Sequence, residues 1–411
     1  MGMPPVLPRL VQSALDDALG VHPVVVVMGA RQTGKSTLVR ALPGDPVREY
    51  LTLDDLHVRG QARTAPEDLV HRADFLVLDE VQREPDLILA IKRAVDERRP
   101  RRRGQFVLTG SANLLLMGRI SESLAGRAGY VPLWPLTRRE RLGLGTAGIW
   151  SALLATPAKE WLDLVQAERV TPADWRDAAR RGGYPTPSHE LDSDRARHLW
   201  YQGYVQTYLE RDLQDLSAID NLVDFQRLMR ATCLRLGGIV NMTELSRDTG
   251  VPRQSVQRHL NLLETSCQLI RVEPYSVNRT KRLIKAPKLY WSDTGLALFL
   301  SGAAEPGGFH LENLVLHDLV AWRDSLVPRP NVLYWRTSAG HEVDFVIEDR
   351  HHLLPIEIKA TAKPTPADAQ HLRTFREEYR DQVRGALLLH TGSQIFWIAQ
   401  HVLAVPWWKV M

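Results

Sequence analysis

The stretch 24-VVVVMGARQTGKSTLVR-40 decides the architecture of the N-terminal third of this chain. Four valines and a methionine make an apolar run of strand length, and residues with helical spacing follow from Ser36 onward. Between them stands the pattern Gly29-x-x-x-x-Gly34-Lys35-Ser36, whose glycines let backbone N–H groups approach phosphate oxygens. The helix behind such a loop points its positive end at the same phosphates. The stretch therefore predicts a strand–loop–helix unit that binds a nucleoside triphosphate.

Two side chains of this loop carry the expected chemistry. We expect Lys35 to reach the β- and γ-phosphates of ATP, and the Ser36 hydroxyl to hold Mg²⁺. An incidental glycine-rich turn is the alternative, but it does not account for the strand and the helix on either side.

A second strand, 75-FLVLDEVQ-82, supplies the acidic groups that an ATP site needs. Its apolar residues deliver Asp79 and Glu80 at a C-terminal strand end, where open α/β sheets place their ligands. We expect Asp79 to hold Mg²⁺ through its water shell, and Glu80 to orient and polarise the attacking water. Without the preceding loop, an Asp-Glu pair at this position would be only a helix cap or a surface pair.

A third strand, 106-FVLTGSAN-113, ends in small polar residues. Thr109, Ser111 or Asn113 can sense the γ-phosphate, but turn formation alone accounts equally well for Gly110 and Asn113. The residues that we predict to bind ATP are Gly29, Ala30, Arg31, Gln32, Thr33, Gly34, Lys35, Ser36, Thr37, Asp79 and Ser111.

Arg127 completes the predicted catalytic set with Lys35 and Glu80. It lies between two glycines in 123-SLAGRAGYVPLWPLTRRE-140, in a short polar joint before a strand. Such an arginine can act as a finger on a neighbouring subunit's nucleotide, which requires a head-to-tail homo-oligomer. An exposed structural arginine fits the same pattern, and the sequence does not separate the two interpretations.

Strands and helices beyond the loop predict an α/β multidomain chain. Residues 1–145 alternate helical stretches with strands, the pattern of a parallel sheet with helices on both faces. These strands are expected at 23–28, 48–53, 74–79, 105–110 and 129–134. Residues 146–235 are mostly helical and are expected to connect or cover the ATPase domain. A compact helical unit at 236–300 and a second α/β domain at 301–411 follow, separated by the Gly/Pro-rich 301-SGAAEPGG-308.

The composition bounds the class of protein. With 411 residues, 44% hydrophobic and 24% charged, the chain is typical of a soluble protein of two to three domains. It has no apolar run of the ~18 residues that a membrane span needs and no signal-peptide core, so we expect a cytoplasmic protein without membrane contact. Cys233 and Cys267 are far apart and predict neither a disulfide nor a zinc site.

The segment 242-MTELSRDTGVPRQSVQRHLNLLETSCQLIRVEPY-275 follows a helix–turn–helix plan. We expect Thr243 to cap the first helix and Gly250 to end it. Val256, Leu260 and Leu263 then form the buried side of the second helix.

The opposite side of that second helix carries residue types that read base edges and phosphates. The residues 268–275 and the basic stretch 279-RTKRLIKAPKLYW-291 would form the hairpin of a winged helix. We therefore predict DNA as a partner, with a winged helix that only packs domains together as the alternative. The predicted DNA-binding residues are Arg253, Gln254, Ser255, Gln257, Arg258, Lys281 and Arg282.

The stretch 341-HEVDFVIEDRHHLLPIEIK-359 predicts a β-hairpin with unusually placed charges. Asp344 interrupts the first apolar run. Glu357 and Lys359 point to one face of the second strand because side chains alternate along a strand. An inward-facing edge-strand salt bridge that blocks aggregation is one explanation of this pattern.

Taken together, the motifs resemble those of bacterial and archaeal AAA-type ATPases of unknown function fused to a C-terminal domain of unknown function. The resemblance rests on GARQTGKST, FLVLDEVQREPDL, FVLTGSAN, SLAGR…PLT, YLERDL, RHLNLLE…KAPKLYWSDTGL and EVDF…PIEIK, and it covers nearly the whole chain. It implies a P-loop ATPase domain, a winged helix and a C-terminal domain similar to PD-(D/E)xK nucleases. Ser36 stands where many members have threonine, which keeps the Mg²⁺-binding hydroxyl.

For the hairpin, the resemblance implies a second metal site. Nucleases of this type hold Mg²⁺, or Mn²⁺, between acidic residues on two strands, and a lysine beside them activates water or stabilises the phosphate. Carried over to this chain, Glu312, Asp344 and Glu357 would hold the metal and Lys359 would be catalytic. A nuclease fold that binds nucleic acid without cutting it is the further alternative.

The sequence thus supports two hypotheses. In the first, a Mg²⁺-dependent ATPase acts on DNA through its winged helix and cuts or grips it through the C-terminal domain. In the second, a regulatory or scaffolding ATPase uses the winged-helix and nuclease-like domains only to bind partners.

Overall fold

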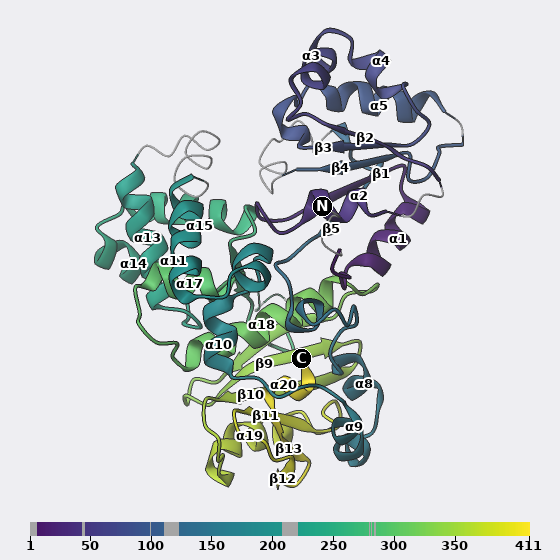
Figure 1. The fold of residues 1–411 in the computed structure, drawn as a ribbon. Coiled ribbons are helices and arrows are strands. Elements are labelled where there is room, and N and C mark those ends of the chain that lie inside the picture. The colour runs from purple at the N-terminus through teal and green to yellow at the C-terminus, as the bar shows by residue number, and fades with distance from the viewer. Residues whose placement is uncertain are drawn as a thin grey trace.

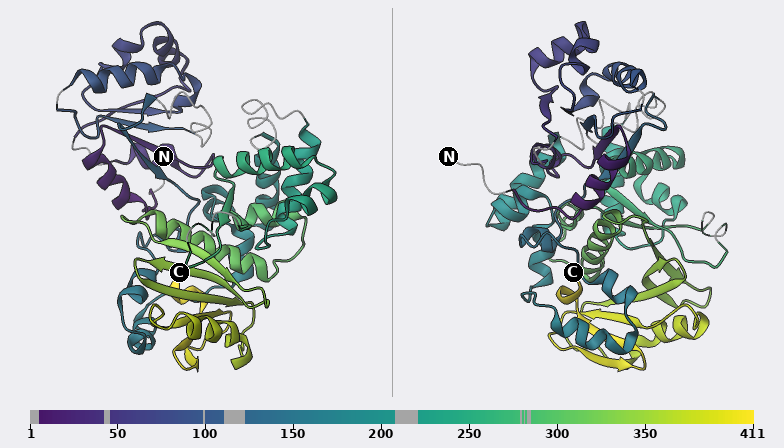
Figure 2. Two further views of the ribbon diagram at one scale, coloured as in Figure 1. Left: turned by 180° about the vertical axis from the view of Figure 1, so that it is seen from behind. Right: turned by 90° about the vertical axis from the view of Figure 1, so that its right-hand side faces the viewer.

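The computed structural model describes residues 6–42, 46–98, 100–110, 123–207, 221–278, 280, 282 and 285–411. Figure 1 shows the N-terminal sheet at the top, a group of helices beside and below it, and the C-terminal sheet at the bottom. Figure 2 shows the same three regions from behind and from one side. The chain is therefore an α/β multidomain protein.

Five parallel strands form the N-terminal sheet, in the order β2-β3-β4-β1-β5. They are β1 (Val24–Met28), β2 (Glu49–Thr52), β3 (Leu76–Asp79), β4 (Phe106–Thr109) and β5 (Ala128–Pro132). All five match strands that the apolar runs predicted. The helices around the sheet are α1 (Gln12–Val21), α2 (Lys35–Arg40), α3 (Leu56–Thr64), α4 (Pro66–Val70) and α5 (Leu87–Glu97).

The valines of β1 show why helices cover both faces of this sheet. Val24 and Val26 belong to the apolar cluster that includes α4 and α5, whereas Val25 and Val27 belong to the cluster that includes α1 and α2. Successive side chains of a strand point to opposite faces, so an unbroken run of valines needs a cover on each side. The predicted parallel sheet with helices on both faces is confirmed.

Helices dominate the middle of the chain. They are α7 (Arg138–Arg141), α8 (Trp150–Ala155), α9 (Trp161–Ala167), α10 (Trp175–Arg181), α11 (Asp194–Tyr204), α13 (Leu222–Leu234), α14 (Met242–Thr249), α15 (Arg253–Thr265) and α17 (Thr294–Ser301). A two-stranded antiparallel sheet of β6 (Leu269–Val272) and β7 (Lys288–Trp291) follows α15.

The turn between α14 and α15 agrees with the sequence pattern in all but one respect. Gly250 ends α14 with a φ of 71°, and Val256, Leu260 and Leu263 of α15 are buried. The N-cap of α14 is Asn241 and not Thr243, since the Asn241 side chain accepts from the backbone N–H groups of Thr243 and Glu244. The neighbouring Val240 N–H donates to Pro287, which holds the chain extended just before the helix.

Six strands form the C-terminal sheet, in the order β12-β13-β11-β10-β9-β8. They are β8 (Asn331–Arg336), β9 (Glu342–Asp349), β10 (His352–Lys359), β11 (Ala386–His390), β12 (Phe396–Ala399) and β13 (Val402–Pro406). The predicted hairpin is the antiparallel pair β9–β10. Apolar clusters cover both faces of this sheet, one with α18 (Gly308–Asp324) and α20 (Trp407–Val410), the other with α19 (Gln370–Glu378).

The segment expected to connect or cover the ATPase domain divides between two regions. Its first helices pack on the C-terminal domain: the Trp150 Nε1 group of α8 donates to Asp318 on α18 at 2.7 Å, and the Ile149 N–H donates to the Val410 carbonyl at 3.1 Å. The later helices α10, α11 and α13 pack against α17. Within the described ranges, none of the helices combines the length and the apolar character that crossing a membrane demands.

Candidate functional site

The C-terminal ends of β1, β3 and β4 bring the predicted nucleotide residues together. Because these strands are parallel, the loop after Met28, the carboxylate of Asp79 and the hydroxyl of Thr109 meet at one edge of the sheet. Gly29 is required there by close packing, since a Cβ atom at this position would lie 2.2 Å from the Leu133 carbonyl oxygen. Gly34, at the start of α2, has a φ of 95°, which only glycine adopts readily.

Lys35 is folded back onto its own loop. Its Nζ donates to the carbonyl oxygens of Gly29 at 3.1 Å and Ala30 at 2.9 Å, and the residue is only 5% exposed. Burial, the largest influence, lowers the pKa of Lys35 in spite of the nearby Glu80 and Asp79 carboxylates. The lysine is thus held beside the phosphate-binding loop by groups that a phosphate can replace.

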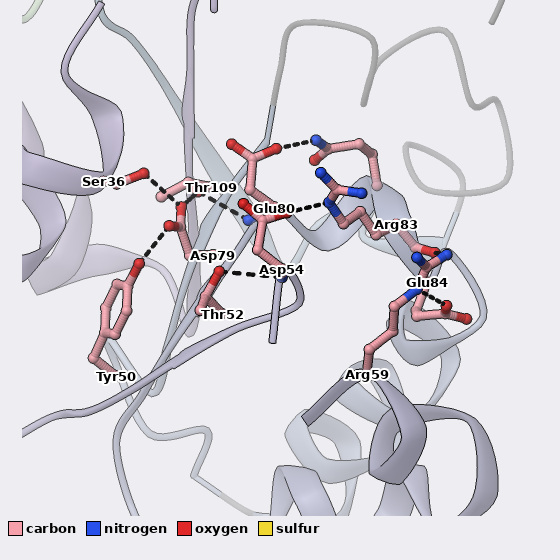
Figure 3. Close-up of polar contacts among 11 residues, drawn as sticks. Ser36, Tyr50, Thr52, Asp54, Arg59, Asp79, Glu80, Arg83, Glu84 and Thr109 are labelled. Atoms are coloured by element: carbon pink, nitrogen blue, oxygen red, sulfur yellow. Dashed lines mark hydrogen bonds and ion pairs between the residues drawn. The ribbon is translucent and has the colours of Figure 1, made fainter. Parts of the chain in front are cut away.

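Asp79 is the centre of a hydrogen-bond network at the strand ends (Figure 3). Ser36 Oγ donates to its Oδ1 at 3.1 Å, Thr109 Oγ1 donates to the same oxygen, and Tyr50 donates to Oδ2. Burial, with the hydrogen bond to Asp79, raises the pKa of Tyr50 to about 12, so the phenol is a proton donor at neutral pH. A hydroxyl and a buried carboxylate side by side are the donor set that suits the Mg²⁺ ion of a bound nucleotide.

Glu80 follows Asp79 in a left-handed backbone conformation, with a φ of 60°. Its backbone N–H donates to Thr109 Oγ1 at 3.2 Å, and the Gln82 amide donates to its carboxylate. This conformation is uncommon for residues other than glycine and often marks functional sites. The turn and the Gln82 amide therefore orient the Glu80 carboxylate.

Arg9 is an anchor of the loop that sequence reasoning missed. Its guanidinium donates to the Thr33 carbonyl at 2.8 Å, to the Trp134 carbonyl at 2.6 Å and to Glu140 Oε1 at 3.0 Å. These partners are far apart in sequence, so no local pattern marks Arg9. Tyr50 was not predicted either, because its partner Asp79 is also distant in sequence.

Two further residues were predicted for the ATP site, Ser111 and Arg127. Ser111 lies outside the described residues. Arg127 directly precedes β5, at the opposite end of the sheet, where its carbonyl accepts from the Val24 N–H at 3.2 Å. Its guanidinium pairs with Asp96 of the same chain, at 2.6 Å and 3.0 Å. In this structure the Arg127 guanidinium is thus tied to α5 of its own chain.

The predicted DNA-binding side chains also divide. On α15, Arg253, Gln254, Gln257 and Arg258 are exposed and Ser255 is half-buried. Lys281 lies outside the described residues. Arg282 is 8% exposed, and both terminal nitrogens of its guanidinium pair with the Glu348 carboxylate of β9, at 2.7 and 2.8 Å.

The C-terminal cluster contains the four residues that the resemblance implied. Lys359 Nζ donates to Glu357 Oε1 at 2.7 Å, and the Ile358 N–H donates to Asp344 Oδ2 at 2.8 Å. Glu312, on α18, accepts a hydrogen bond from the Tyr290 phenol. Burial, followed by the Asp344 carboxylate, raises the pKa of Glu312 to about 7 and that of Glu357 to about 8.

The cluster departs from the implied metal site. Among the residues that the structure describes, no group of three or more His, Cys, Asp or Glu side chains is placed to hold a metal ion. Lys288 enters between the carboxylates instead, with its Nζ 2.6 Å from Glu342, 3.5 Å from Glu312 and 3.9 Å from Asp344. The arrangement predicted for Glu312, Asp344 and Glu357 around one metal therefore does not fit this structure. Neither Lys288 nor Glu342 was singled out in the sequence.

The parallel sheet and its phosphate-binding loop define a P-loop protein, and residues 21–142 match the AAA domain family. Two further stretches match domains of unknown function, DUF8612 at residues 172–306 and DUF4143 at residues 307–410. The chain belongs to the family of the uncharacterized proteins Mb2031c of Mycobacterium bovis and Rv2008c of Mycobacterium tuberculosis. It is 32% identical to each over 400 residues, which is 95% of this chain and 81% of each relative.

Solved structures show weaker likeness. The Walker-type ATPase PABY2304 of Pyrococcus abyssi matches with a TM-score of 0.43 and 16% identity, over 73% of this chain and 99% of that one. AMPPCP-bound DnaA from Aquifex aeolicus matches with a TM-score of 0.27 and 14% identity, over 62% of this chain and 86% of that one. At these scores the likeness establishes no common fold over the aligned length.

Proposed function

We propose that this protein is a Mg²⁺-dependent ATPase that acts on DNA. The observation that carries the proposal is the convergence of Lys35, Ser36, Asp79 and Glu80 at one edge of the parallel sheet. Each of these side chains makes a hydrogen bond to a neighbouring protein group. The AAA domain family match over residues 21–142 supports the same chemistry.

The roles follow from the contacts. Lys35 would exchange the carbonyls of Gly29 and Ala30 for the β- and γ-phosphates of ATP. Ser36 and Asp79 would hold Mg²⁺, which neutralises charge on the phosphates. Glu80 would orient the attacking water and accept its proton, with Gln82 fixing the carboxylate.

The central helices touch the nucleotide loop directly. The Tyr204 phenol of α11 donates to the Arg31 carbonyl at 3.4 Å, and Ala30 belongs to the same apolar cluster as the central helices. A change in the loop conformation on nucleotide binding would therefore alter the position of these helices. In this way the ATPase domain would control DNA binding through α15.

A regulatory or scaffolding ATPase is the second candidate. Arg282 and Lys288, two basic residues of the predicted winged helix, bind carboxylates of the C-terminal domain. This observation favours domain packing, rather than DNA contact, as the task of that part of the central unit.

ATP hydrolysis tests the nucleotide site. We expect the wild type to release phosphate in the presence of Mg²⁺, and Lys35→Ala and Glu80→Gln to lower the rate by at least about 100-fold. The matched control is Arg83→Gln, which changes another charged side chain of the turn after β3, one that pairs with Asp54. Wild-type rates in both site variants would refute the assignment.

Salt-dependent DNA binding separates the two candidate functions. If α15 contacts phosphates, the affinity falls steeply as salt rises, and Arg253→Glu with Arg258→Glu reduces that slope by about two. Lys159→Glu, at an 81% exposed lysine in the segment between α8 and α9, is the control for a general change of charge. If the wild type shows no salt-dependent binding, the regulatory candidate replaces the first.

A further inference from the structure

Lys288 is a buried lysine whose ammonium lies inside an acidic cluster of another domain. It is the first residue of β7, and its side chain is 2% exposed. Its Nζ pairs with Glu342 of β9 at 2.6 Å, with Glu312 of α18 at 3.5 Å and with Asp344 of β9 at 3.9 Å. A single ammonium is therefore shared by three carboxylates from two elements.

Other residues of the central unit and of the C-terminal domain also contribute to the contact around Lys288. Tyr290, two residues along β7, donates to the Glu312 oxygen that Lys288 also approaches. Gly237, with a φ of 74°, comes so close that a Cβ atom there would lie 3.3 Å from both Glu312 oxygens. The Lys288 ammonium also lies over the Tyr334 ring, 5.6 Å from its centroid. Burial alone would lower the pKa of Lys288, but the Glu312, Asp344 and Glu342 carboxylates outweigh it and raise that pKa.

A second observation shows that the cluster has room for another positive charge. Glu357 is 4% exposed, and its Oε2 has no hydrogen-bond partner in the described residues, while its Oε1 takes Lys359. A buried carboxylate oxygen without a partner is costly. Three cations face the four acidic side chains of Glu312, Glu342, Asp344 and Glu357: Lys288, Lys359 and Arg336, which lies 3.5 Å from Glu342. The acidic groups therefore remain in excess by one.

Lys288 and a divalent ion compete for the same oxygens. A divalent cation needs oxygen ligands at roughly 2.0–2.6 Å, and two positive charges this close repel strongly in a buried site. Glu312 Oε1 already accepts from Tyr290 and faces Lys288, and Asp344 Oδ2 accepts from the Ile358 N–H.

We propose that Lys288 is the resident cation of the C-terminal cluster, and that it keeps Mg²⁺ and Mn²⁺ out of a site whose carboxylates would otherwise bind one such ion. As long as β7 stays in place, the central unit therefore keeps divalent ions out of the acidic cluster of the C-terminal domain. This inference goes beyond the proposed function and does not depend on ATP hydrolysis or on DNA binding.

A titration of the full chain with Mn²⁺ alone, without nucleotide, tests this proposal. The electron paramagnetic resonance signal of the free ion measures how much Mn²⁺ is bound. We expect Lys288→Met to gain a site at least about tenfold tighter than any the cluster offers in the wild type. The gain should be lost in Lys288→Met/Glu357→Gln. Arg282→Met is the matched control, because it removes another buried cation between the same two domains, one that pairs with Glu348 outside the cluster. It should leave the Mn²⁺ isotherm unchanged.

Two results would overturn the proposal. One is a folded Lys288→Met protein, checked by circular dichroism, with the isotherm of the wild type. The other is tight Mn²⁺ binding by the wild type that Glu357→Gln abolishes. If Lys288→Met does not fold, Lys288→Gln keeps a donor for Glu342 without the charge, and the comparison of wild type with Glu357→Gln still decides. ATP hydrolysis by the same preparations reports on the nucleotide site separately.

Discussion

Asp318 shows what a single buried charge does in this molecule. It is 1% exposed on α18; Trp150 donates to its Oδ2 at 2.7 Å, and its Oδ1 has no hydrogen-bond partner among the described residues. Burial, the dominant influence, raises its pKa to about 6. The ionised carboxylate therefore costs folding free energy at neutral pH.

We expect Asp318→Asn to stabilise the protein at pH 8 by about 1–3 kcal/mol, because the amide keeps the Trp150 hydrogen bond and never ionises. The gain should shrink as the pH falls through 6, since the folded wild type then binds a proton that its unfolded chain releases. Urea unfolding at pH 8 and at pH 5 measures both values.

Asp324, on the same helix, is the control for that change. It also accepts from a tryptophan, Trp134 at 2.8 Å, but it pairs with Arg323 and Arg329 as well. Asp324→Asn should therefore bring no gain at pH 8. Equal gains in both variants, or a gain for Asp318→Asn that does not change with pH, would contradict this account.

At the level of single residues, the sequence predicted positions that follow a local rule. Lys35 and Ser36 belong to a spaced pattern, and Glu357 and Lys359 share a strand face because of its two-residue period. The ion pair of Arg282 could not be predicted, because its partner, Glu348, is 66 residues away. No pattern in the sequence connects residues at that separation.

At the level of elements, Asp293 ties α17 to the turn after α10. Its carboxylate accepts from the N–H groups of Leu296 at 2.7 Å and Tyr184 at 3.2 Å, and from the Tyr201 phenol at 3.1 Å. The Gly183 N–H is a further donor. Gly182 is needed beside it, because a Cβ atom there would meet the Asp293 carboxylate at 2.5 Å.

We expect Asp293→Ala to lower the free energy of unfolding by about 3–5 kcal/mol, because it leaves several buried donors without an acceptor. Asn241→Ala is the control: it removes an N-cap whose hydrogen bonds are local and exposed, and should cost about 1 kcal/mol. Urea unfolding at pH 7 gives both numbers, and equal costs would show that Asp293 is only a helix cap.

The strands of the first sheet were predictable because each is a short apolar run beside a turn. The cap of α14 was not, because Asn241 and Thr243 are both good capping residues. The local sequence does not separate the two; in the structure, the Val240 N–H donates to the Pro287 carbonyl directly before Asn241.

At the level of the whole molecule, the central helices stand between the nucleotide loop and the C-terminal cluster (Figure 1). Tyr204 touches the Arg31 carbonyl, and Gln268 donates to the Tyr204 phenol at 3.1 Å. The Gln268 carbonyl accepts from the Ser292 N–H at 2.8 Å, next to β7. Because Lys288 begins that strand, a continuous set of contacts joins the two sites. The sequence predicted the order of the domains but not this connection, which depends on residues distant along the chain.

This set of contacts predicts that nucleotide state changes DNA binding, and that the Tyr204 hydroxyl is needed for the change. In the wild type, we expect DNA affinity to differ by at least about fivefold between ADP and a non-hydrolysable ATP analogue. In Tyr204→Phe the two affinities should converge, because the ring keeps its packing while the bridge between Arg31 and Gln268 is lost. Fluorescence anisotropy of a labelled duplex at fixed salt measures all four affinities.

Tyr379→Phe is the matched control for the loss of a hydroxyl, since Tyr379 follows α19 and packs against Tyr275 and Phe375 in the C-terminal domain. It should keep the wild-type difference between the nucleotides. If Tyr204→Phe also keeps that difference, the coupling does not pass through α11, and the contact with Arg31 only positions the loop. If the wild type binds DNA equally in both states, the nucleotide does not control DNA binding at all. A coupling seen in the wild type and lost only in Tyr204→Phe would place the signal in the central helices, where a physical link requires one element that responds to both ligands.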